Sequence, residues 1–314
     1  MGIYAAGEVI RRTRESLGMT QEELCEGICD VVTLSRIENG RNTPSRANFE
    51  LLMERMGKSG KKYLPFIRSG DIRDHLLREE LERLIGIYDY QMAKQVLDEL
   101  AKHLEKGDAV NWQYILRMQA AIEYRLGLIS VSERRNLLEK ALQCTGCAFT
   151  KLKWKNGNMT EQEMGIICNI AMTYMEEEQY EKSIEILEGL KRYLESVYFE
   201  SKTRIYRLVI SNLGHVFGRS GDAKQAKELK TQALKLAIKE NNAGSMAGIL
   251  YDIAYENEKL GQKKDICLKQ LVQAYILAEC TNSTYLIKHI EEHATGSYEW
   301  KRVKHLLEND HSEA

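Results

Sequence analysis

The sequence has only two prolines, Pro44 and Pro65, and both lie in its first quarter. Proline breaks helices because it lacks a backbone N–H and clashes with the preceding turn. The long stretch after Pro65 has no such interruption, and it is rich in Leu, Glu, Lys, Ala and Gln, which favour helices. We therefore predict an all-α fold.

Long apolar runs and a secretory leader are also missing. No window approaches the roughly 18 consecutive apolar residues of a membrane span, and the N-terminal segment lacks the apolar core of a signal peptide. The seven cysteines are scattered and odd in number, which is unlike a disulfide framework. We expect a cytoplasmic protein that does not interact with membranes.

Motifs of catalysis are scarce. There is no glycine-rich phosphate loop, and no Ser or Cys stands in a recognised nucleophile motif. Cys144 and Cys147 form a CxxC, which could be a redox pair, half a zinc site or a plain loop turn, but no second ligand pair follows. His289 to His293 matches an HxxEH zinc motif, yet few residues remain downstream to supply a third ligand. We predict no enzyme activity, no cofactor and no metal site.

The overall charge is nearly balanced, with 45 Lys and Arg against 46 Asp and Glu. This balance neither supports nor excludes a nucleic-acid partner, because the field that matters is local to the binding face. At 314 residues the chain is too long for one ordinary core, so we expect two or more packed units.

Residues 7 to 57 divide into short helices joined by tight turns. Thr20 and Glu23 have the spacing of a capping box, which predicts the start of one helix. Asp30 is a good N-cap for the next helix, residues 31–38, which ends at Asn39-Gly40. Two short helices with a brief turn between them are the plan of a helix-turn-helix.

The motif LGMTQEEL at residues 17–24, followed by LSRIENG at 34–40, resembles the Cro/phage-repressor (XRE-type) DNA-binding family. The match covers residues 1–57. The resemblance implies that the helix at 31–38 lies in the major groove of a double-stranded DNA operator. It also implies that Arg14 on the first helix pairs with Glu38.

Leu34 and Ile37 are the apolar positions that must face the core, so the other side of their helix faces the DNA. On that side Arg36 suits guanine and the valines suit the thymine methyl group. The valines could instead pack in the core, Arg36 could bind phosphate, and the whole domain could bind protein. The candidate DNA-binding residues are Gln21, Val31, Val32, Thr33, Ser35, Arg36, Arg41 and Asn42.

Residues 58–70 are predicted to be a linker, because they begin with a glycine-rich basic stretch that Tyr63-Leu64-Pro65 closes. The remaining residues, 71–314, contain helical hairpins that repeat at about 40 residues. Segments beginning at Asn169, Asn212 and Asp252 align, at spacings of 43 and 40 residues, and each is followed by a turn.

Each aligned segment has a small residue, Ala171, Gly214 or Ala254, which would let two antiparallel helices approach closely. This pattern resembles the tetratricopeptide repeat, whose usual period is about 34 residues. The resemblance implies a helical solenoid with a concave groove for an extended peptide. The polar residues could equally bond adjacent helices or water. The candidate peptide-binding residues are Gln119, Asn169, Asn212, His215, Arg219, Asp252 and Tyr255.

An XRE-type head joined to a repeat body resembles the peptide-pheromone receptors of Gram-positive bacteria, including the Rgg and PlcR types. The resemblance implies a homodimeric transcriptional regulator that senses a short signalling peptide or another effector. The alternative is a repeat scaffold whose N-terminal domain mediates only protein contacts.

Overall fold

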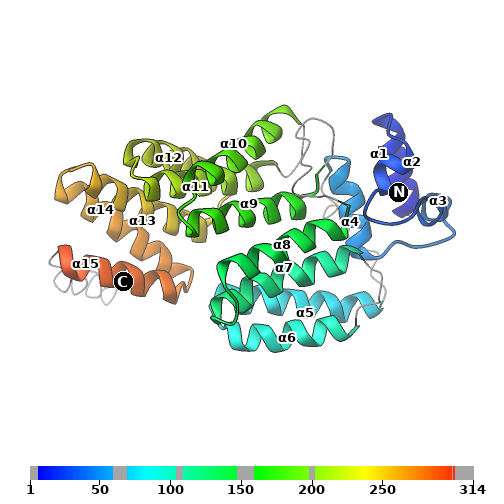
Figure 1. Ribbon diagram of the computed structural model, residues 1–314, viewed down its shortest axis with the longest axis horizontal. Helices are drawn as coiled ribbons and strands as arrows, with labels where there is room; N and C mark the ends of the chain where they lie inside the picture. The colour runs from blue at the N-terminus through cyan, green and yellow to red at the C-terminus, as the bar shows by residue number, and fades with distance from the viewer. Residues whose placement is uncertain are drawn as a thin grey trace, which may run out of the picture. The chain divides into compact units, whose positions relative to one another are not determined.

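The computed structural model describes residues 6–58, 69–103, 109–146, 159–197, 202–298 and 300. Within these ranges the protein is helical and contains no strand, as predicted (Figure 1). The chain divides into two compact units, residues 1–209 and residues 210–314. Most of the linker predicted at 58–70 falls outside the described residues.

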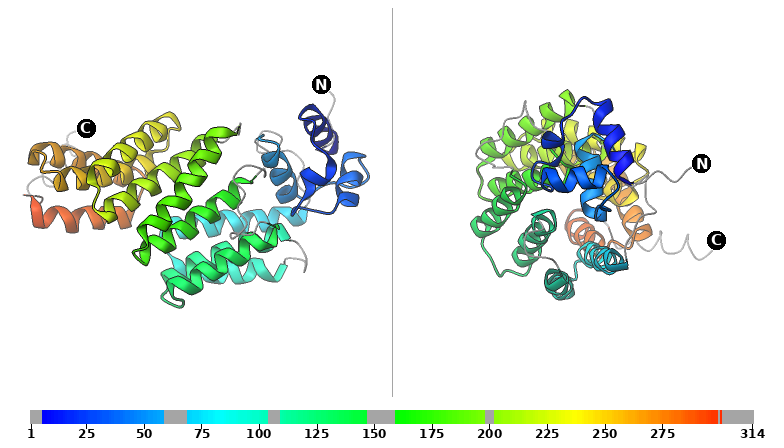
Figure 2. Two further views of the ribbon diagram at one scale, coloured as in Figure 1. Left: turned by 45° about the horizontal axis from the view of Figure 1, so that its top comes forward. Right: turned by 90° about the vertical axis from the view of Figure 1, so that its right-hand side faces the viewer.

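The head of the first unit consists of four short helices, which Figure 2 shows grouped together. Neighbouring residues determine where two of these helices begin. Thr20 and Glu23 form the predicted capping box of one helix, and the side chain of Asp30, the N-cap of the next helix, accepts a hydrogen bond from the backbone N–H of Thr33. Ile10, Leu24, Leu34 and Leu52 are fully buried in one core. The four helices are α1 (Ala6–Ser16), α2 (Gln21–Cys25), α3 (Val31–Glu38) and α4 (Arg46–Arg55).

The rest of the first unit is built from helical hairpins, in which neighbouring helices pack against each other. Ser130 and Thr160 begin two of these helices with capping boxes, each completed by a glutamate three residues later. The helices are α5 (Ser69–Gly86), α6 (Tyr90–His103), α7 (Ala109–Arg125), α8 (Val131–Cys144), α9 (Glu161–Glu176) and α10 (Tyr180–Ser196).

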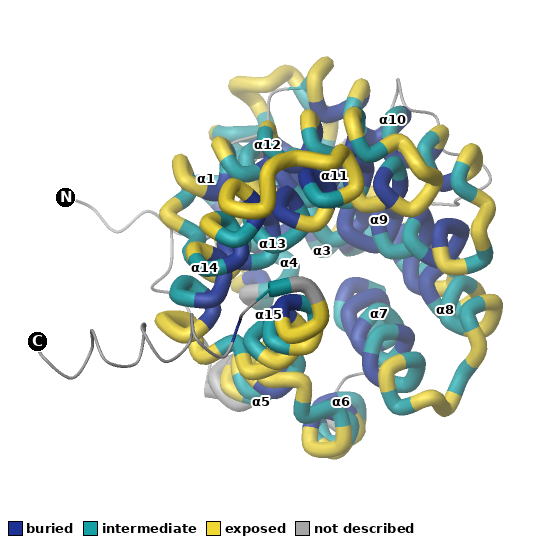
Figure 3. Tube along the Cα trace, turned by 90° about the vertical axis from the view of Figure 1, so that its left-hand side faces the viewer, coloured by how far each residue is buried: buried dark blue, intermediate teal, exposed yellow. Residues whose placement is uncertain are grey.

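The second unit continues the hairpin pattern. Helix α11 (Lys202–Ser220) contains the boundary between the units, and the helices that follow it are α12 (Ala223–Lys239), α13 (Ala243–Lys259), α14 (Lys264–Cys280) and α15 (Thr284–Ser297). The predicted turns after residues 177, 219 and 259 separate α9 from α10, α11 from α12 and α13 from α14. Figure 3 shows exposed residues gathering at such turns.

The small residues of the repeats perform the expected packing role. Ala171 is fully buried, and its carbonyl accepts a 2.8 Å hydrogen bond from Ser183 of the paired helix. A Cβ at Gly214 would lie 3.2 Å from the carbonyl oxygen of Ala226 on α12. Both contacts show helices so close that a larger side chain would separate them.

The described residues contain no helix that is both long and apolar enough to cross a membrane. They also contain no group of three or more His, Cys, Asp or Glu side chains arranged to hold a metal ion. Cys147, the second cysteine of the CxxC, lies outside the described residues.

Candidate DNA-binding surface and peptide-binding residues

Helix α3 has one buried side and one solvent side. Leu34 and Ile37 are buried in the head core as the sequence predicts, while Val31 packs partly against that core. Val32, in contrast, is 59% exposed. Val31 therefore packs partly in the core, which was the alternative considered for the two valines, whereas the methyl groups of Val32 face solvent.

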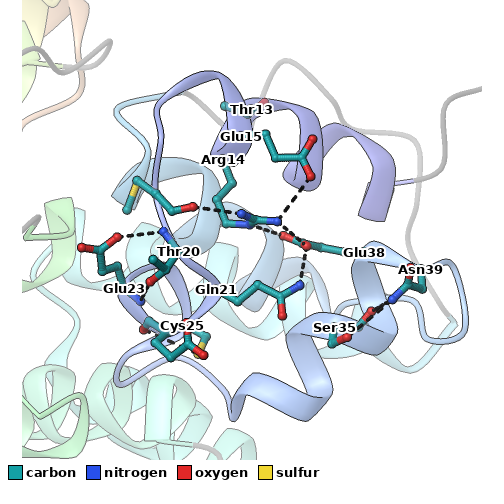
Figure 4. A network of polar contacts seen from close by, with 12 residues as sticks. Thr13, Arg14, Glu15, Thr20, Gln21, Glu23, Cys25, Ser35, Glu38 and Asn39 are labelled. Carbon is teal, nitrogen blue, oxygen red and sulfur yellow. Dashed lines mark hydrogen bonds and ion pairs between the residues drawn. The ribbon is translucent and has the colours of Figure 1, made fainter.

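The guanidinium of Arg14 fixes the C-terminal end of α3 to α1 (Figure 4). It donates two hydrogen bonds to the carboxylate of Glu38, at 2.7 and 2.8 Å, and a third to the carbonyl of Met19 at 2.9 Å. The bonds to Glu38 raise the pKa of Arg14. The Arg14–Glu38 pair is thus the one that the XRE-type resemblance implies, and it is buried and bidentate.

Gln21 shares this network, because its Nε2 donates to Glu38 at 2.6 Å. Gln21 is one of the predicted DNA-binding residues. One of its two amide hydrogens is already used within the protein, so a contact with DNA would rest on the other hydrogen.

The other candidate DNA-binding residues differ in whether their side chains already form contacts within the protein. The hydroxyl of Thr33 donates to Asp30 at 2.7 Å and so helps to cap α3. Ser35 is half-buried next to Asn39, whose side chain donates to the Ser35 carbonyl at 2.8 Å. Arg36, Arg41 and Asn42 are exposed, and neither arginine forms an ion pair with any described residue.

The head also packs on the helices that follow it within the first unit. Val110 of α7 belongs to the same buried cluster as the core of α1–α4. Gly27 has φ +70°, and a Cβ there would overlap the backbone of Thr145 at the end of α8. Glycine is therefore required at this position both by conformation and by space. This contact could not be predicted from the sequence, because no local pattern relates two segments so far apart in the chain.

Glu54 of α4 is part of the same contact. Its carboxylate accepts a 3.3 Å hydrogen bond from the backbone N–H of Glu161, the first residue of α9. Burial raises the pKa of Glu54 to about 8, and the negative charge of Glu161 adds to the effect. Arg204 pairs with Glu161 and only partly offsets this charge.

We expect this contact between the head and α9 to weaken as the pH rises. The folded pKa of Glu54, about 8, lies above its ordinary value of 4.5, so its contribution is complete below about pH 4.5 and is lost as the pH rises through 8. Glu54→Gln should remove this loss and make α4 more stable at pH 8.5 by on the order of 2 kcal/mol. Hydrogen exchange of peptides from α4, measured at pH 6 and pH 8.5 and corrected for the intrinsic rate, would show it. The exposed Glu181→Gln serves as the control, and equal pH dependence in both variants would contradict the prediction.

In the first unit the peptide-binding candidates are Gln119 and Asn169, which lie on α7 and α9. The Gln119 amide donates to Glu123 on its own helix at 3.1 Å. Asn169 is half-buried, and its side chain makes no hydrogen bond to any described residue. Its amide therefore keeps both a donor and an acceptor, the pair needed to bind one peptide unit.

In the second unit three candidates, Asn212, His215 and Arg219, lie on α11 at intervals of three and four residues, which places them on one helix face. His215 is exposed. Desolvation by its surroundings lowers the pKa of His215, and the charges of Lys230 and Arg219 lower it further against the opposing effect of Asp252. The lowered pKa favours the neutral imidazole, which can both donate and accept a hydrogen bond.

Asp252 of α13 has a structural partner. Its carboxylate forms an ion pair with the buried Lys230 of α12, whose ammonium group also donates to Ser211 at 3.4 Å. This matches the alternative in which a polar residue of the repeat bonds an adjacent helix. Lys230 was not identified from the sequence, because a lysine in an amphipathic helix ordinarily signals solvent.

Tyr255, the last candidate, is 44% exposed. Lys259 lies 4.6 Å from its ring centre, and His293 of α15 meets it edge-on at 5.6 Å. His293 in turn contacts Glu258 at 2.7 Å and the hydroxyl of Tyr251 at 3.1 Å. The HxxEH histidine therefore joins an aromatic cluster between α13 and α15, a role that the motif did not suggest.

Comparison with known proteins agrees with this architecture. The model of a helix-turn-helix family matches residues 10–62. The structure of PlcR from Bacillus thuringiensis in complex with the peptide PapR7 and DNA aligns with a TM-score of 0.63 and 18% identity, covering 91% of this chain and 98% of PlcR. ComR from Streptococcus thermophilus, in complex with DNA and its signalling peptide ComS, aligns with a TM-score of 0.56 and 16% identity, covering 93% of this chain and 99% of ComR.

PlcR in its apo form is also similar, with a TM-score of 0.58, 16% identity and coverage of 91% of this chain and 98% of PlcR. No curated protein matches by sequence. At these identities the structural likeness establishes the fold. The chain thus has a helix-turn-helix domain over residues 10–62, and over nearly its whole length it shares the helical fold of PlcR and ComR.

Proposed function

We propose that this protein is a sequence-specific, DNA-binding transcriptional regulator whose repeat region binds a short signalling peptide. The observation that supports DNA binding most directly is the solvent side of α3. It presents Val32 and Arg36, and the exposed Arg41 follows shortly after the helix. Neither arginine forms an ion pair with any described residue, and the domain matches a helix-turn-helix family. Apolar methyl groups beside unpaired guanidinium groups suit base edges and phosphates in the major groove.

Peptide binding is supported by the unused amide groups of the repeats. Asn169 and Asn212 lie on alternate helices and make no side-chain hydrogen bonds to described residues. Half-buried amides without partners are costly unless a ligand or water satisfies them. PlcR and ComR, which share this fold, were solved with a bound peptide and DNA.

We also propose that the protein is a cytoplasmic homodimer and that it catalyses no reaction. One helix-turn-helix head reads only a half-site, and two heads related by a twofold axis read a palindromic operator. Coupling then requires that the peptide bind one arrangement of the heads more tightly than another.

Arg36→Ala tests the assignment of the reading helix. Duplexes selected from a random pool by the full-length protein should bind the variant about 1–3 kcal/mol more weakly, roughly 5- to 150-fold, because a base or phosphate contact is lost. Fluorescence anisotropy at several salt concentrations measures both the affinity and its salt dependence. Arg125→Ala, at another exposed arginine on α7, should bind as wild type does.

Two results would count against the proposal in different ways. Wild-type affinity in Arg36→Ala would exclude α3 as the reading helix. Failure of the intact protein to bind any duplex at low salt, with the head folded, would favour the scaffold alternative.

A further inference from the structure

The turn between α2 and α3 is packed between α4 and the end of α8. On the side of the head, Arg55 at the end of α4 is buried, and its guanidinium donates hydrogen bonds to the carbonyls of Leu24, at 3.2 Å, and of Glu26. On the other side, the backbone of Thr145 lies so close to Gly27 that a Cβ there would overlap the Thr145 carbonyl. Helix α3 begins four residues after Gly27. The path of the chain into α3 is therefore set by the head and by the end of α8 together.

Thr145 is itself fixed by a buried hydrogen-bond network of the repeat region. Its hydroxyl accepts from Nε2 of Gln113 on α7 at 2.7 Å and donates to the carboxylate of Glu163 on α9 at 2.6 Å, and all three residues are buried. Gln113 also accepts from Gln162 at 3.0 Å, and Glu163 accepts from the backbone N–H of Thr160 at 2.8 Å. Such a network favours a single arrangement of the elements that it joins. Helices α7, α8 and α9 therefore present the Thr145 backbone to the head at a fixed position.

A second contact joins the head and the repeat region close to the first. Glu54 precedes Arg55 on α4, and its carboxylate accepts from the backbone N–H of Glu161 at the start of α9. The same helix packs on α7, where Val110 belongs to the buried cluster of the head. Two adjacent residues of α4 thus bond in different directions, Arg55 to the turn before α3 and Glu54 to α9.

These contacts fix the direction of α3 and leave its solvent side free. Val32 and Arg36 remain exposed while Gly27 is in contact with Thr145. Two backbones in direct contact have no intervening side chain that could adjust to a change of angle. Rotation of the head would therefore break the contact at Gly27. The structure assigns α3 one orientation relative to α7, α8 and α9.

A fixed orientation has a consequence for the operator that a dimer accepts. Each base pair inserted between two half-sites rotates one of them by about 34° and moves it by about 3.4 Å relative to the other. A head attached only through the covalent chain could follow this change, whereas a head fixed to its repeat region could not.

We propose that Gly27, through its contact with Thr145 and with the support of Glu54, is a specificity-determining residue that restricts the regulator to one spacing between half-sites. Gly27 acts by positioning α3 and does not touch the DNA itself. This inference rests on the proposed DNA-binding function and on the proposed homodimer.

The test compares Gly27→Ala with Gly18→Ala in the full-length protein. Both glycines have positive φ, +70° and +67°, so alanine introduces similar backbone strain in the head, but only at Gly27 would the new Cβ meet another segment. The probes are the palindromic duplex that the wild-type protein selects, the same duplex with one or two base pairs inserted or removed at its centre, and a duplex with a single half-site. Fluorescence anisotropy at one fixed salt concentration measures each affinity.

We expect the wild-type protein and Gly18→Ala to bind duplexes of altered spacing at least about 10-fold more weakly than the selected duplex, because both heads can no longer engage at once. Gly27→Ala should bind the whole series within about 3-fold, since a released head can follow its half-site. Its affinity for the single half-site should equal that of Gly18→Ala. This last measurement distinguishes a released head from a damaged one, because damage to the head would weaken the single half-site as well.

Glu54→Ala is a second variant that removes a contact with α9 and adds no strain to the head. It should broaden the range of accepted spacings in the same direction, and it decides the matter where alanine at Gly27 lowers the affinity for the single half-site. An unchanged spacing profile in Glu54→Ala and Gly27→Ala would overturn the inference, as would equal binding of the wild-type protein to every spacing, and both results would leave DNA binding intact. Failure of the wild-type protein to bind any duplex would overturn the proposed function together with this inference.

Discussion

Glu38→Ala should destabilise the head by about 3–5 kcal/mol, because it removes the buried bidentate partner of Arg14 and leaves only the more exposed carboxylate of Glu15, 3.7 Å from the guanidinium. The side chain of Glu38 is only 1% exposed and that of Arg14 is 12% exposed, so water cannot replace the lost carboxylate. Gln21 loses its acceptor at the same time. Since every 1.4 kcal/mol is a factor of ten, amide exchange in α3 should accelerate by about two to four orders of magnitude.

Hydrogen exchange of the intact chain, followed for peptides within residues 31–38, measures this loss where it occurs. The control is Glu80→Ala, which removes the carboxylate of an exposed ion pair with Arg83 and should leave protection unchanged, because solvent screens that pair. The double variant Arg14→Met with Glu38→Leu should recover part of the protection, since it removes both charges. If Glu38→Ala exchanged like wild type, the buried pair would not be what fixes α3 to α1.

Gly7→Ala should cost about 3 kcal/mol, because it forces apart two backbones in the head. A Cβ at Gly7 would overlap the carbonyl oxygen of Ile37 and lie 2.6 Å from its carbonyl carbon. A backbone carbonyl inside a helix cannot move aside as a side chain can, so α1 and α3 must separate. We expect faster amide exchange in both helices and weaker binding to the selected duplexes, since α3 would lose its support.

Gly248→Ala is the matched control for this substitution. It lies within α13, and an added Cβ there would meet nothing within 4 Å. Alanine is the better helix former, so this variant should be stabilised by about 0.5–1 kcal/mol. Wild-type exchange rates in Gly7→Ala would show that the head tolerates a wider spacing between α1 and α3.

Both predictions concern the support of α3 from behind, on the side away from the proposed DNA. Leu34 and Ile37 are completely buried there, and Glu38 ties the end of the helix to α1. The residues that would read the duplex therefore lie on a helix whose position is set by apolar packing and one ion pair. Such rigid support reduces the ordering cost of binding.

Much of the fold could be predicted because its signals are local. The limits of α3 follow from Asp30 as the N-cap and from the Asn39-Gly40 stop, and the observed helix has the predicted bounds. The small residues Ala171, Gly214 and Ala254 marked the buried side of alternate helices. Caps, turns and periodicity involve residues within a few positions of each other, so a sequence displays them directly.

The partners of the charged and polar side chains could not be predicted in the same way. Helical spacing placed Asp252 among the candidate ligand residues but did not show that Lys230 is its partner. The carboxylate of Glu54 meets an N–H group 107 residues later in the chain.

By itself, the sequence determined the all-helical class of the fold, the helix-turn-helix head, the repeating helical hairpins and the side of α3 that faces solvent. These features depend on short-range hydrogen bonds and on the alternation of apolar and polar residues. Only the tertiary structure decided which buried charges are paired with each other, as Glu38 is with Arg14 and Lys230 with Asp252. The reason is physical: the energy of a charge in a folded protein is set by the atoms and water around it, and those atoms come from segments distant in the chain.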